Sequence, residues 1–156
     1  MDLGIANLVA LSDGTFVANP KHLAAGAAKL ASAQAGLAGK VKGSTRRRAQ
    51  VQRVAAAHRK IRRQRADHAH QVPRWLVERF DVIAYEDLAI ANMARRAKPV
   101  PDVEHPGSWL PNGAAAKSGL NRSIHDAGWG QLVAFISYKA AEAGRQAIAV
   151  DPRQSR

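Results

Sequence analysis

Apolar residues spaced three and four positions apart within a basic segment constrain the fold of this chain more than any other feature. Leucines recur every seven residues at Leu23, Leu30 and Leu37, with Ala27 between them. Such spacing is typical of helices that pack along one seam. Because a turn rich in glycine, lysine and serine follows at residues 39–44 and leads into a second seam, the sequence predicts an antiparallel helical hairpin. The second seam consists of Val51, Val54, His58, Ile61, Arg65, His68 and Val72.

The charge of this segment indicates its partner. Residues 14–66 contain 13 lysines and arginines and no aspartate or glutamate, whereas the rest of the chain contains 11 basic and 12 acidic residues. A field of one sign attracts polyanions, and nucleic acid is the commonest of these in a cytosol. An anionic membrane surface and a merely solvated helix are the alternatives. We favour nucleic acid because the segment lacks the bulky apolar face of membrane-surface helices.

The second predicted helix, from about residue 45 to 70, is a stiff basic rod of roughly 39 Å. Ser44 or Thr45 is the expected N-cap, and Gly43 supplies the bend. Its lysines and arginines fall off the seam, so we expect them to form an exposed ridge. With the lysines of the preceding turn, the candidate nucleic-acid-binding residues are Lys40, Lys42, Arg46, Arg47, Arg48, Arg53, Arg59, Lys60, Arg62 and Arg63.

Composition excludes several classes of protein. The chain has no cysteine, which rules out a disulfide framework, a thiolate zinc site and a cysteine nucleophile. No run approaches the roughly 18 apolar residues of a membrane helix, and the start does not resemble a signal peptide. We therefore expect a soluble cytoplasmic protein with no membrane partner.

The residues before the basic segment are expected to form strands. Met1-Asp2-Leu3-Gly4 looks like the end of a strand, and residues 7–12 and 15–18 flank the dipeptide Asp13-Gly14. A two-residue primed turn requires positive φ values, so Asp-Gly between two apolar runs predicts a β-hairpin. Asn19-Pro20 ends this hairpin.

A second set of elements follows Pro73. Residues 74–80 are expected to form a short amphipathic helix. Residues 82–85 are too short a run for a helix and are apolar on both faces, as in a central strand covered on both sides. Strand alternation sends Glu86 and Asp87 to opposite faces, so at most one of these carboxylates shares a face with a given active site.

The last third of the chain begins with residues 91–122, whose prolines and glycines predict a long loop with little structure of its own. A final helix starts at Ser123 or Asp126 and stops at Gly144. Residues 146–150 read as the last strand. The apolar stripe of the helix consists of Trp129, Leu132, Val133, Ile136 and Ala140.

Short motifs occur along the chain in a recognisable order. They are Met1-Asp2-Leu3-Gly4-Ile5-Ala6-Asn7-Leu8, Leu11-Ser12-Asp13-Gly14, Asn19-Pro20-Lys21, Lys42-Gly43-Ser44, Tyr85-Glu86-Asp87-Leu88, Asp126-Ala127-Gly128-Trp129-Gly130, Tyr138-Lys139-Ala140 and Val150-Asp151-Pro152. In this order they closely resemble the TnpB (OrfB) family of insertion-sequence proteins, related to the RNA-guided type V CRISPR effector nucleases. The resemblance covers nearly the whole chain, and its specificity lies in the order of the motifs.

The resemblance implies an α/β protein with a RuvC-like (RNase H) fold, a transposase-associated endonuclease that cuts DNA under the direction of a guide RNA. By resemblance, Asp2 takes the place of the first catalytic, metal-binding carboxylate and Glu86 that of the second, and Gly4 leaves space for the metal. Such sites hold Mg²⁺ or Mn²⁺, which prefer oxygen ligands, activate water and stabilise the leaving oxygen. The implied location is the prokaryotic cytoplasm, at the nucleoid.

The resemblance also divides the chain. Residues 1–20 correspond to the first strands of the core, 21–72 to the inserted basic hairpin, and 73–156 to the remainder of the core. The family's zinc ribbon and third catalytic aspartate would follow Val150-Asp151-Pro152. The resemblance therefore implies a partial domain that lacks zinc and is inactive alone.

A different class of function stays open beside this one. The basic hairpin alone would suit a non-catalytic nucleic-acid-binding module, and the oligomeric state is not indicated. Two further sets of residues suggest chemistry but are expected to be structural. His58 and His68 lie about 15 Å apart along one helix, too far to share a metal. Ser123, His125 and Asp126 are the residue types of a hydrolase triad, but we expect them to cap a helix.

Overall fold

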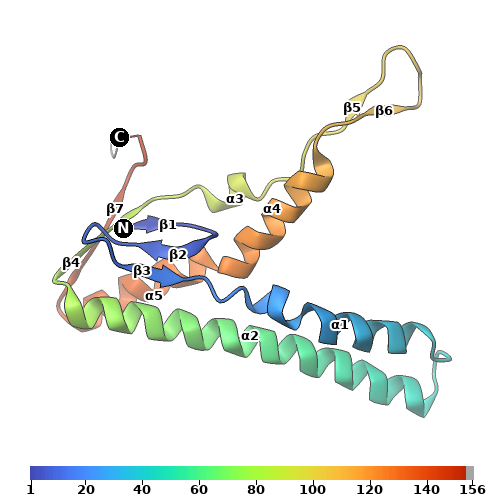
Figure 1. Cartoon of the computed structure of the whole chain (residues 1–156), viewed down its shortest axis with the longest axis horizontal. Coiled ribbons are helices and arrows are strands. Elements are labelled where there is room, and N and C mark those ends of the chain that lie inside the picture. Colours follow the sequence, from blue (N-terminus) through green and yellow to red (C-terminus); the bar gives the residue numbers. More distant parts are fainter. Residues whose placement is uncertain (154–156) are drawn as a thin grey trace.

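The structure, a computed structural model, describes residues 1–153 as a mixed α/β body with two extensions (Figure 1). One extension is a long pair of helices, and the other is a small β-hairpin on the opposite side of the body. None of the helices in residues 1–153 combines the length and apolar character needed to cross a membrane. The elements are β1 (Asp2–Leu3), β2 (Asn7–Ala10), β3 (Phe16–Ala18), α1 (His22–Ala38), α2 (Thr45–Arg79), β4 (Val82–Glu86), α3 (Ile90–Met93), β5 (Val100–Pro101), β6 (Trp109–Leu110), α4 (Ala114–Ala127), α5 (Trp129–Glu142) and β7 (Gln146–Val150).

The first three strands form an antiparallel sheet in the order β1-β2-β3, as the N-terminal hairpin motif predicts. The predicted type of turn is wrong. The backbone N–H of Gly14 donates to the carbonyl of Leu11 (3.1 Å), and the Leu11 N–H donates to Thr15 (2.9 Å), which encloses a loop of three residues. Gly14 alone takes a positive φ, of 84°. The Asp13 carboxylate instead accepts a bond from the Thr15 N–H (2.8 Å), which favours this longer turn.

A bulge in β2 buries two consecutive residues. The register jumps between Asn7 and Val9, so Leu8 is the extra residue of the strand. Regular alternation would send Leu8 and Val9 to opposite faces, yet both are buried in the same core. The N-terminal sheet therefore contributes two large side chains at one point.

Strands β4 and β7 form a parallel pair in which Ile83 lies opposite Ala147. Both strands lie where the sequence predicts them. The expectation that residues 82–85 are covered on both faces is wrong for residues 1–153. Ile83 is buried against the helices, but Val82 is 54% exposed and Ile148 is 44% exposed. The described helices pack on one face of this pair only, and a short apolar run does not distinguish one covered face from two.

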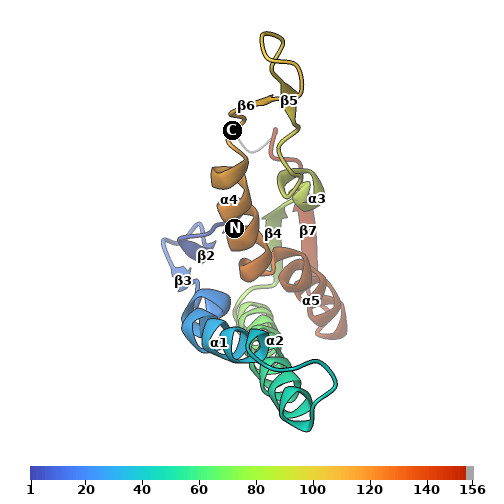
Figure 2. The same cartoon turned by 90° about the vertical axis from the view of Figure 1, so that its right-hand side faces the viewer.

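Helices α1 and α2 lie side by side and run in opposite directions (Figures 1 and 2). A Cβ atom on Gly26 would lie 2.8 Å from Cδ1 of Ile61, so this glycine allows a close approach of the two backbones. The predicted seam is right at Leu30 and Ile61, which are buried. It is wrong at its N-terminal end, where Val51 is 43% exposed. His58 and Ala27 are exposed as well.

Gln50 replaces Val51 in the contact between the helices. Its amide Nε2 donates to the backbone carbonyl of Ala33 in α1 (2.9 Å), and the residue is buried. Gly36 leaves room for this side chain, since a Cβ atom there would lie 2.8 Å from Nε2. A buried polar group that gains a partner thus takes the seam position from a valine one residue away.

Helix α2 continues without interruption through Pro73, so the predicted end near residue 70 and the separate helix at 74–80 are wrong. Its predicted N-cap is right, because Oγ of Ser44 accepts a bond from the Arg47 N–H (3.1 Å). A proline inside a helix removes one backbone hydrogen bond. Pro73 is fully buried, together with Leu76 one turn later, and this continuous apolar face offsets the loss.

About half of the predicted loop at residues 91–122 lies in helices and strands, so this expectation is wrong for that half. It contains α3, the β5–β6 hairpin and the first part of α4. All its prolines precede residue 112, and the segment from Ala114 onward is rich in alanine, which favours a helix. Helix α5 begins only at Trp129, because Gly128 adopts a φ of 67° and separates it from α4. The predicted apolar stripe of this helix is buried at Trp129, Leu132, Ile136 and Ala140 and partly buried at Val133.

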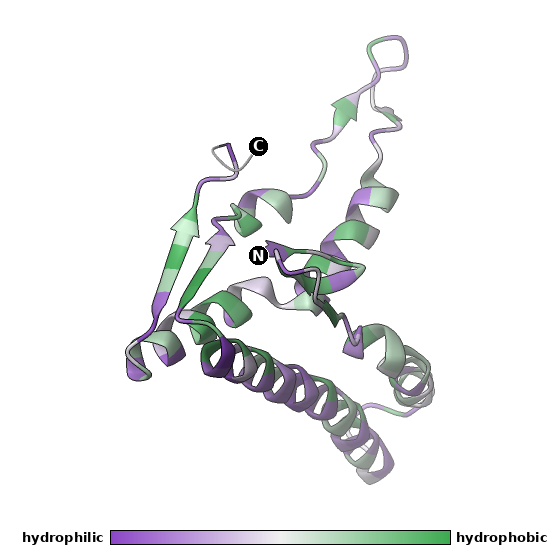
Figure 3. Ribbon diagram, turned by 60° about the vertical axis from the view of Figure 1, so that its left-hand side comes forward, coloured by the Kyte–Doolittle hydropathy of each residue, from purple (hydrophilic) through white to green (hydrophobic). Residues whose placement is uncertain are grey.

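One hydrophobic core joins the sheets to the helices. It draws on β2, β4, α4, α5 and the C-terminal part of α2. In Figure 3, β4 and β7 are mostly hydrophobic, whereas the long course of α2 is mostly hydrophilic. The buried residues of the core are Leu8, Val9, Val72, Leu76, Val77, Ile83, Ile124, Trp129, Leu132, Ile136 and Ala140.

Candidate functional site

The two predicted catalytic carboxylates lie on neighbouring strands. Asp2 is in β1, and Glu86 is the last residue of β4. The amino group of Met1 donates a hydrogen bond to the backbone carbonyl of Ala84 (2.7 Å), which holds β1 beside β4. Two residues that are far apart in the sequence are thereby brought to one edge of the body.

Both carboxylates point away from the core. Leu3 packs against the core cluster, so Asp2, the preceding residue, points to the opposite face and is exposed. Ile83 is buried, and Glu86 follows three positions later, which places it on the face opposite Ile83. Glu86 is partly buried and Asp2 is fully accessible.

Further carboxylates lie near the end of β4. Asp87 is exposed, and its N–H donates to the carbonyl of Val150 (2.9 Å). Because β4 and β7 are parallel with Glu86 opposite Val150, Asp151 also emerges at this edge. Asp151 has no role among the predicted site residues, although an acidic residue after a second apolar run is a signal that two strand ends meet here.

The chemistry of these donors suits a hard divalent cation, because carboxylate oxygens are the ligands that Mg²⁺ and Mn²⁺ prefer. In the described part of the chain, no three histidine, cysteine, aspartate or glutamate residues gather closely enough to hold a metal ion. Asp2 and Glu86 are therefore two candidate ligands on adjacent strands.

Gly4 has a structural reason to be glycine. A Cβ atom at this position would lie 2.7 Å from the backbone oxygen of Asn7, in the tight connection between β1 and β2. The carbonyl of Gly4 also accepts a hydrogen bond from Nε1 of Trp129 (3.3 Å). Local backbone geometry thus accounts for this glycine without a metal.

The candidate nucleic-acid-binding residues lie on α2 and on the turn before it, and all are exposed except Arg47. The guanidinium of Arg47 donates to the backbone carbonyls of Leu37 (3.0 Å) and Lys40 (3.2 Å), at the C-terminal end of α1. Arg53 donates to Oε1 of Gln50 (3.1 Å). Arg47 is therefore part of the contact between the helices.

Two basic grooves border α2. One, of about 620 Å³, is lined by Lys29 of α1 and by Arg53 and Lys60 of α2. The other, of about 540 Å³, is lined by Arg59, Arg62 and Arg65 together with other residues. No acidic residue lines either groove. Lys29 was not among the predicted binding residues, because its own helix carries few charges.

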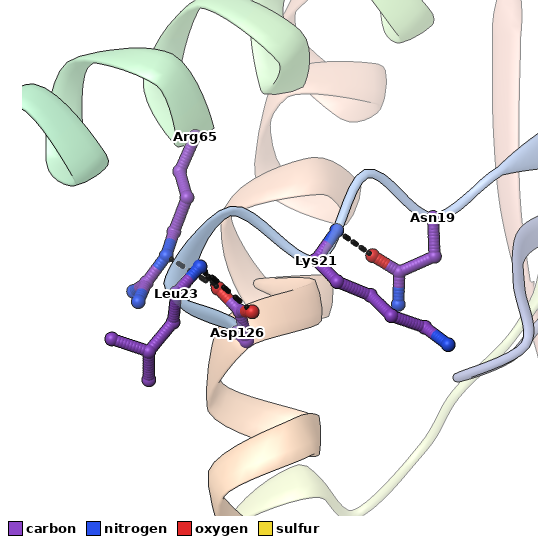
Figure 4. Close-up of polar contacts among 5 residues, drawn as sticks. All are labelled: Asn19, Lys21, Leu23, Arg65 and Asp126. Carbon is purple, nitrogen blue, oxygen red and sulfur yellow. Dashed lines mark hydrogen bonds and ion pairs between the residues drawn. The ribbon is translucent and has the colours of Figure 1, made fainter. Parts of the chain in front are cut away.

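Asp126 does not cap its own helix as predicted (Figure 4). Its carboxylate accepts hydrogen bonds from the backbone N–H of Leu23 (2.9 and 3.0 Å) and from Nε of Arg65 (3.0 Å). It therefore satisfies the first turn of α1 and ties α1, α2 and α4 together. Ser123 bonds the carbonyl of Gly119 (3.2 Å) within α4. These contacts assign Ser123 and Asp126 structural roles.

The histidines of α2 also have structural surroundings. The rings of His68 and His22 are 6.0 Å apart at their centroids and meet edge to face. Burial, and to a lesser extent the neighbouring His22, lowers the pKa of His68. His70 stacks on Phe135, with ring centroids 4.2 Å apart.

Comparisons with known proteins agree with the motifs. Residues 1–97 match the OrfB_IS605 family model, which is described as "Probable transposase". A protein of Streptomyces pristinaespiralis named "Putative RNA-guided DNA endonuclease" is 32% identical over 97% of this chain and 32% of its own length. A protein of Escherichia coli K12 named "Putative RNA-guided DNA endonuclease InsQ" is 36% identical over 97% of this chain and 36% of its own length. The chain thus spans about a third of the length of these curated relatives.

Proposed function

Because this chain belongs to the OrfB_IS605 family of transposases, we propose that it is the RuvC-like part of a metal-dependent, RNA-guided DNA endonuclease that acts in transposition. Residues 1–20 and 73–156 form the nuclease core, and residues 21–72 form an inserted basic helical hairpin. Since α2 is continuous from Thr45 to Arg79, the insertion and the core share this helix. A guide RNA and DNA are the partners, at the prokaryotic nucleoid.

The hydrogen bond between the Met1 amino group and the Ala84 carbonyl is the observation that carries the catalytic proposal (2.7 Å). It supports a common site for Asp2 and Glu86, because it holds their strands side by side. In a RuvC-like nuclease, carboxylates from different strands share the metal. The mixture of helices and small sheets in the chain is compatible with this fold.

In this proposal Asp2 and Glu86 ligate Mg²⁺ or Mn²⁺. The bound cations would activate water and stabilise the leaving oxygen of an in-line displacement. The protein residues supply orientation: Glu86 is partly buried and fixed at the end of a paired strand, whereas Asp2 is open to solvent. Their position on the face away from the core leaves room for a phosphate backbone.

The basic surface of α2 holds the nucleic acid in this proposal. Nine of the ten predicted residues are exposed, and four of them line the two grooves, Arg53 and Lys60 one groove and Arg59 and Arg62 the other. Lysine and arginine side chains on a long helix contact phosphates without reading sequence. Arg47 is the exception, and its main contribution is to the contact between α1 and α2.

The catalytic proposal is tested by cleavage of a plasmid that matches the guide RNA. This chain replaces the matched segment of the E. coli relative, which is 36% identical. Asp2→Asn and Glu86→Gln should each reduce Mg²⁺-dependent cleavage to background. Asp87→Asn is the matched control, because Asp87 is exposed and points to the other face of the strand end.

Cleavage that survives Glu86→Gln would overturn the catalytic assignment. A chimera that binds nucleic acid but never cuts would favour the non-catalytic binding module. That alternative is supported by the finding that residues 1–153 contain no group of three metal-ligating side chains.

The binding surface is tested by the salt dependence of affinity. If about six phosphates are contacted, the affinity of the 156-residue chain for duplex DNA or RNA should fall roughly 10³-fold between about 50 and 200 mM salt. Replacing the exposed residues by glutamine should flatten this dependence, whereas Arg74→Gln should not, because Arg74 pairs with Glu78 (2.8 Å). An unchanged salt slope would remove α2 from the binding surface. The residues to replace are Arg46, Arg48, Arg59, Lys60, Arg62 and Arg63.

A further inference from the structure

The β5–β6 hairpin extends from the body beyond the N-terminal end of α4 (Figures 1 and 2). Trp109 in β6 is 65% exposed, although Trp129 in the core is fully buried. Trp109 lies opposite Pro101, and Leu110 lies opposite Val100. The two-stranded hairpin therefore exposes the large aromatic ring of Trp109 to solvent.

A basic groove of about 520 Å³ lies at the base of this hairpin. One wall is the segment after α3, which contributes Arg96. The other wall is one face of α4, whose lining residues follow a spacing of three and four positions. They are Ala114, Lys117, Ser118, Asn121, Arg122 and His125.

The charge around this groove has one sign. Residues 88–101 and 105–125 contain no aspartate or glutamate, and they contain five lysines and arginines. The two intervening acidic residues, Asp102 and Glu104, lie at the tip of the hairpin. The carboxylate of Asp102 already forms hydrogen bonds with Nδ1 of His105 (3.0 Å) and with the backbone N–H of Glu104 (2.9 Å). The groove itself is therefore complementary to a polyanion.

Hydrogen bonds to backbone carbonyls fix the walls of the groove. Lys117 Nζ donates to Met93 (2.6 Å), and Asn121 Nδ2 donates to Ala94 (2.8 Å). Asn112 Nδ2 donates to Lys98 (2.6 Å) where the hairpin begins. Within residues 1–153, no hydrogen bond of this kind ties the side chains of Arg96 and Arg122, which makes these two cations suitable for phosphates.

One wall of the groove is close in sequence to Glu86 of the candidate carboxylate site. Leu88 N–H bonds the carbonyl of Glu86 (3.0 Å), and Ile90 N–H bonds that of Leu88 (2.7 Å), so a tight turn leads from β4 into α3. The segment that follows α3 directly forms the groove wall. One wall of the groove thus follows Glu86 along the chain after a single turn and one short helix.

We propose that the β5–β6 hairpin and this groove bind single-stranded DNA, with Trp109 stacked on an unpaired base and with Arg96 and Arg122 on phosphates. An exposed aromatic ring beside a basic groove is the combination that binds single strands, because bases stacked inside a duplex do not offer a free face. The assignment of DNA as the strand rests on the proposed endonuclease function. Without that function, the same chemistry would suit single-stranded RNA.

Tryptophan fluorescence tests this contact in the 156-residue chain, with EDTA present to exclude metal. An oligothymidylate of about 12 nucleotides should quench the emission of the wild-type protein by stacking. Trp109→Phe should abolish most of this quenching while retaining binding. Trp75→Phe is the matched control, because Trp75 is partly buried on α2 and contacts Arg79.

Affinity is measured in parallel by fluorescence anisotropy of the labelled oligonucleotide. The exposed arginines and lysine of α2 are replaced by glutamine to remove their contribution. In this background, Trp109→Ala should weaken binding about 5- to 100-fold, and Arg96→Gln should weaken it further. Trp109→Tyr should restore most of the affinity, because tyrosine also stacks.

Unchanged affinity and quenching in Trp109→Ala would overturn the proposal, as would tighter binding of an oligouridylate than of the oligothymidylate. The two proposals fail separately. Glu86→Gln leaves binding of the single strand intact but removes plasmid cleavage, so normal binding without any Glu86-dependent cleavage would reject only the catalytic site. Cleavage that is unaffected by Trp109→Ala, with unchanged binding, would reject only the hairpin.

Discussion

The two ends of helix α2 are packed in different ways. At its C-terminal end, Val72, Leu76 and Val77 lie in a core of large apolar side chains from the sheets and α5. Nearer its N-terminal end, the helix packs against α1 through Gly26 and through Gln50, which bonds a backbone carbonyl. One helix is thus held by burial of apolar area at one end and by close backbone approach at the other.

This difference explains how a helix with so many arginines stays folded. Burial of large side chains needs a wide apolar stripe, which leaves fewer positions for charge. Contact through small residues needs only a narrow stripe, so most positions around the helix remain free for exposed lysines and arginines. The hydrophilic colour along much of α2 in Figure 3 reflects this. The basic surface is a consequence of the packing mode.

The largest expected effect is in the apolar end. Leu76 is fully buried, so Leu76→Ala should lower the free energy of unfolding by about 3 to 5 kcal/mol. Leu30→Ala, in the contact between α1 and α2, should cost less, about 2 kcal/mol, because alanine and glycine neighbours leave a smaller cavity. Urea denaturation followed by circular dichroism measures both. Val51→Ala is the exposed control; equal losses at Leu76 and Leu30 would contradict the distinction.

An intermediate effect is expected where the backbones approach. Gly26→Leu should lower the free energy of unfolding by about 1 to 3 kcal/mol, because the new side chain meets Ile61. Gly119→Ala in α4 meets no neighbouring atom and should raise stability by about 0.5 to 1 kcal/mol through helix propensity. Adding Ile61→Ala to Gly26→Leu should recover part of the loss. If Gly26→Leu also stabilises the protein, the helices are not in close contact.

The smallest expected effect concerns pH at the junction of the two regions. Burial lowers the pKa of His68 below its ordinary value of 6.5. The unfolded chain therefore binds a proton more readily than the folded chain. Stability is unaffected well above pH 6.5 and decreases as the pH falls below that value. Denaturation midpoints at about pH 7.5 and 5.5 should differ less in His68→Gln than in the wild type. His58→Gln, at an exposed position, should behave as the wild type.

The sequence predicts the kind and order of most elements, because the charge distribution and apolar spacing both reflect burial. Predictions fail where one specific contact decides the outcome. Pro73 breaks no helix because it lies on the buried face of α2 with Val72 and Leu76, and Gln50 displaces Val51 because its amide bonds a backbone carbonyl. The prolines of residues 91–122 predict a loop for the whole segment, but all of them precede α4, so they say nothing about its helical part.

The arrangement of the candidate site is harder to predict from the sequence than the helices and strands are. The family motif singles out Asp2 and Glu86, but only the structure, with the bond from Met1 to Ala84 and further contacts between β1 and β4, reveals that their strands are neighbours. Asp126 illustrates the same limit. Its partners, Leu23 and Arg65, are distant in the sequence, so local patterns indicated a cap on its own helix instead.

Because α2 is one continuous helix, a small rotation about its buried C-terminal end produces a large displacement of its basic N-terminal end. About 40 Å of helix separates Thr45 from the buried Val72, and only two residues lie between the end of the helix and β4. A tilt of about 5° around the buried end moves the far end by roughly 4 Å and displaces the start of β4 very little. A polymer held at the basic end can therefore shift by about one nucleotide spacing while the strands that carry Asp2 and Glu86 stay in place.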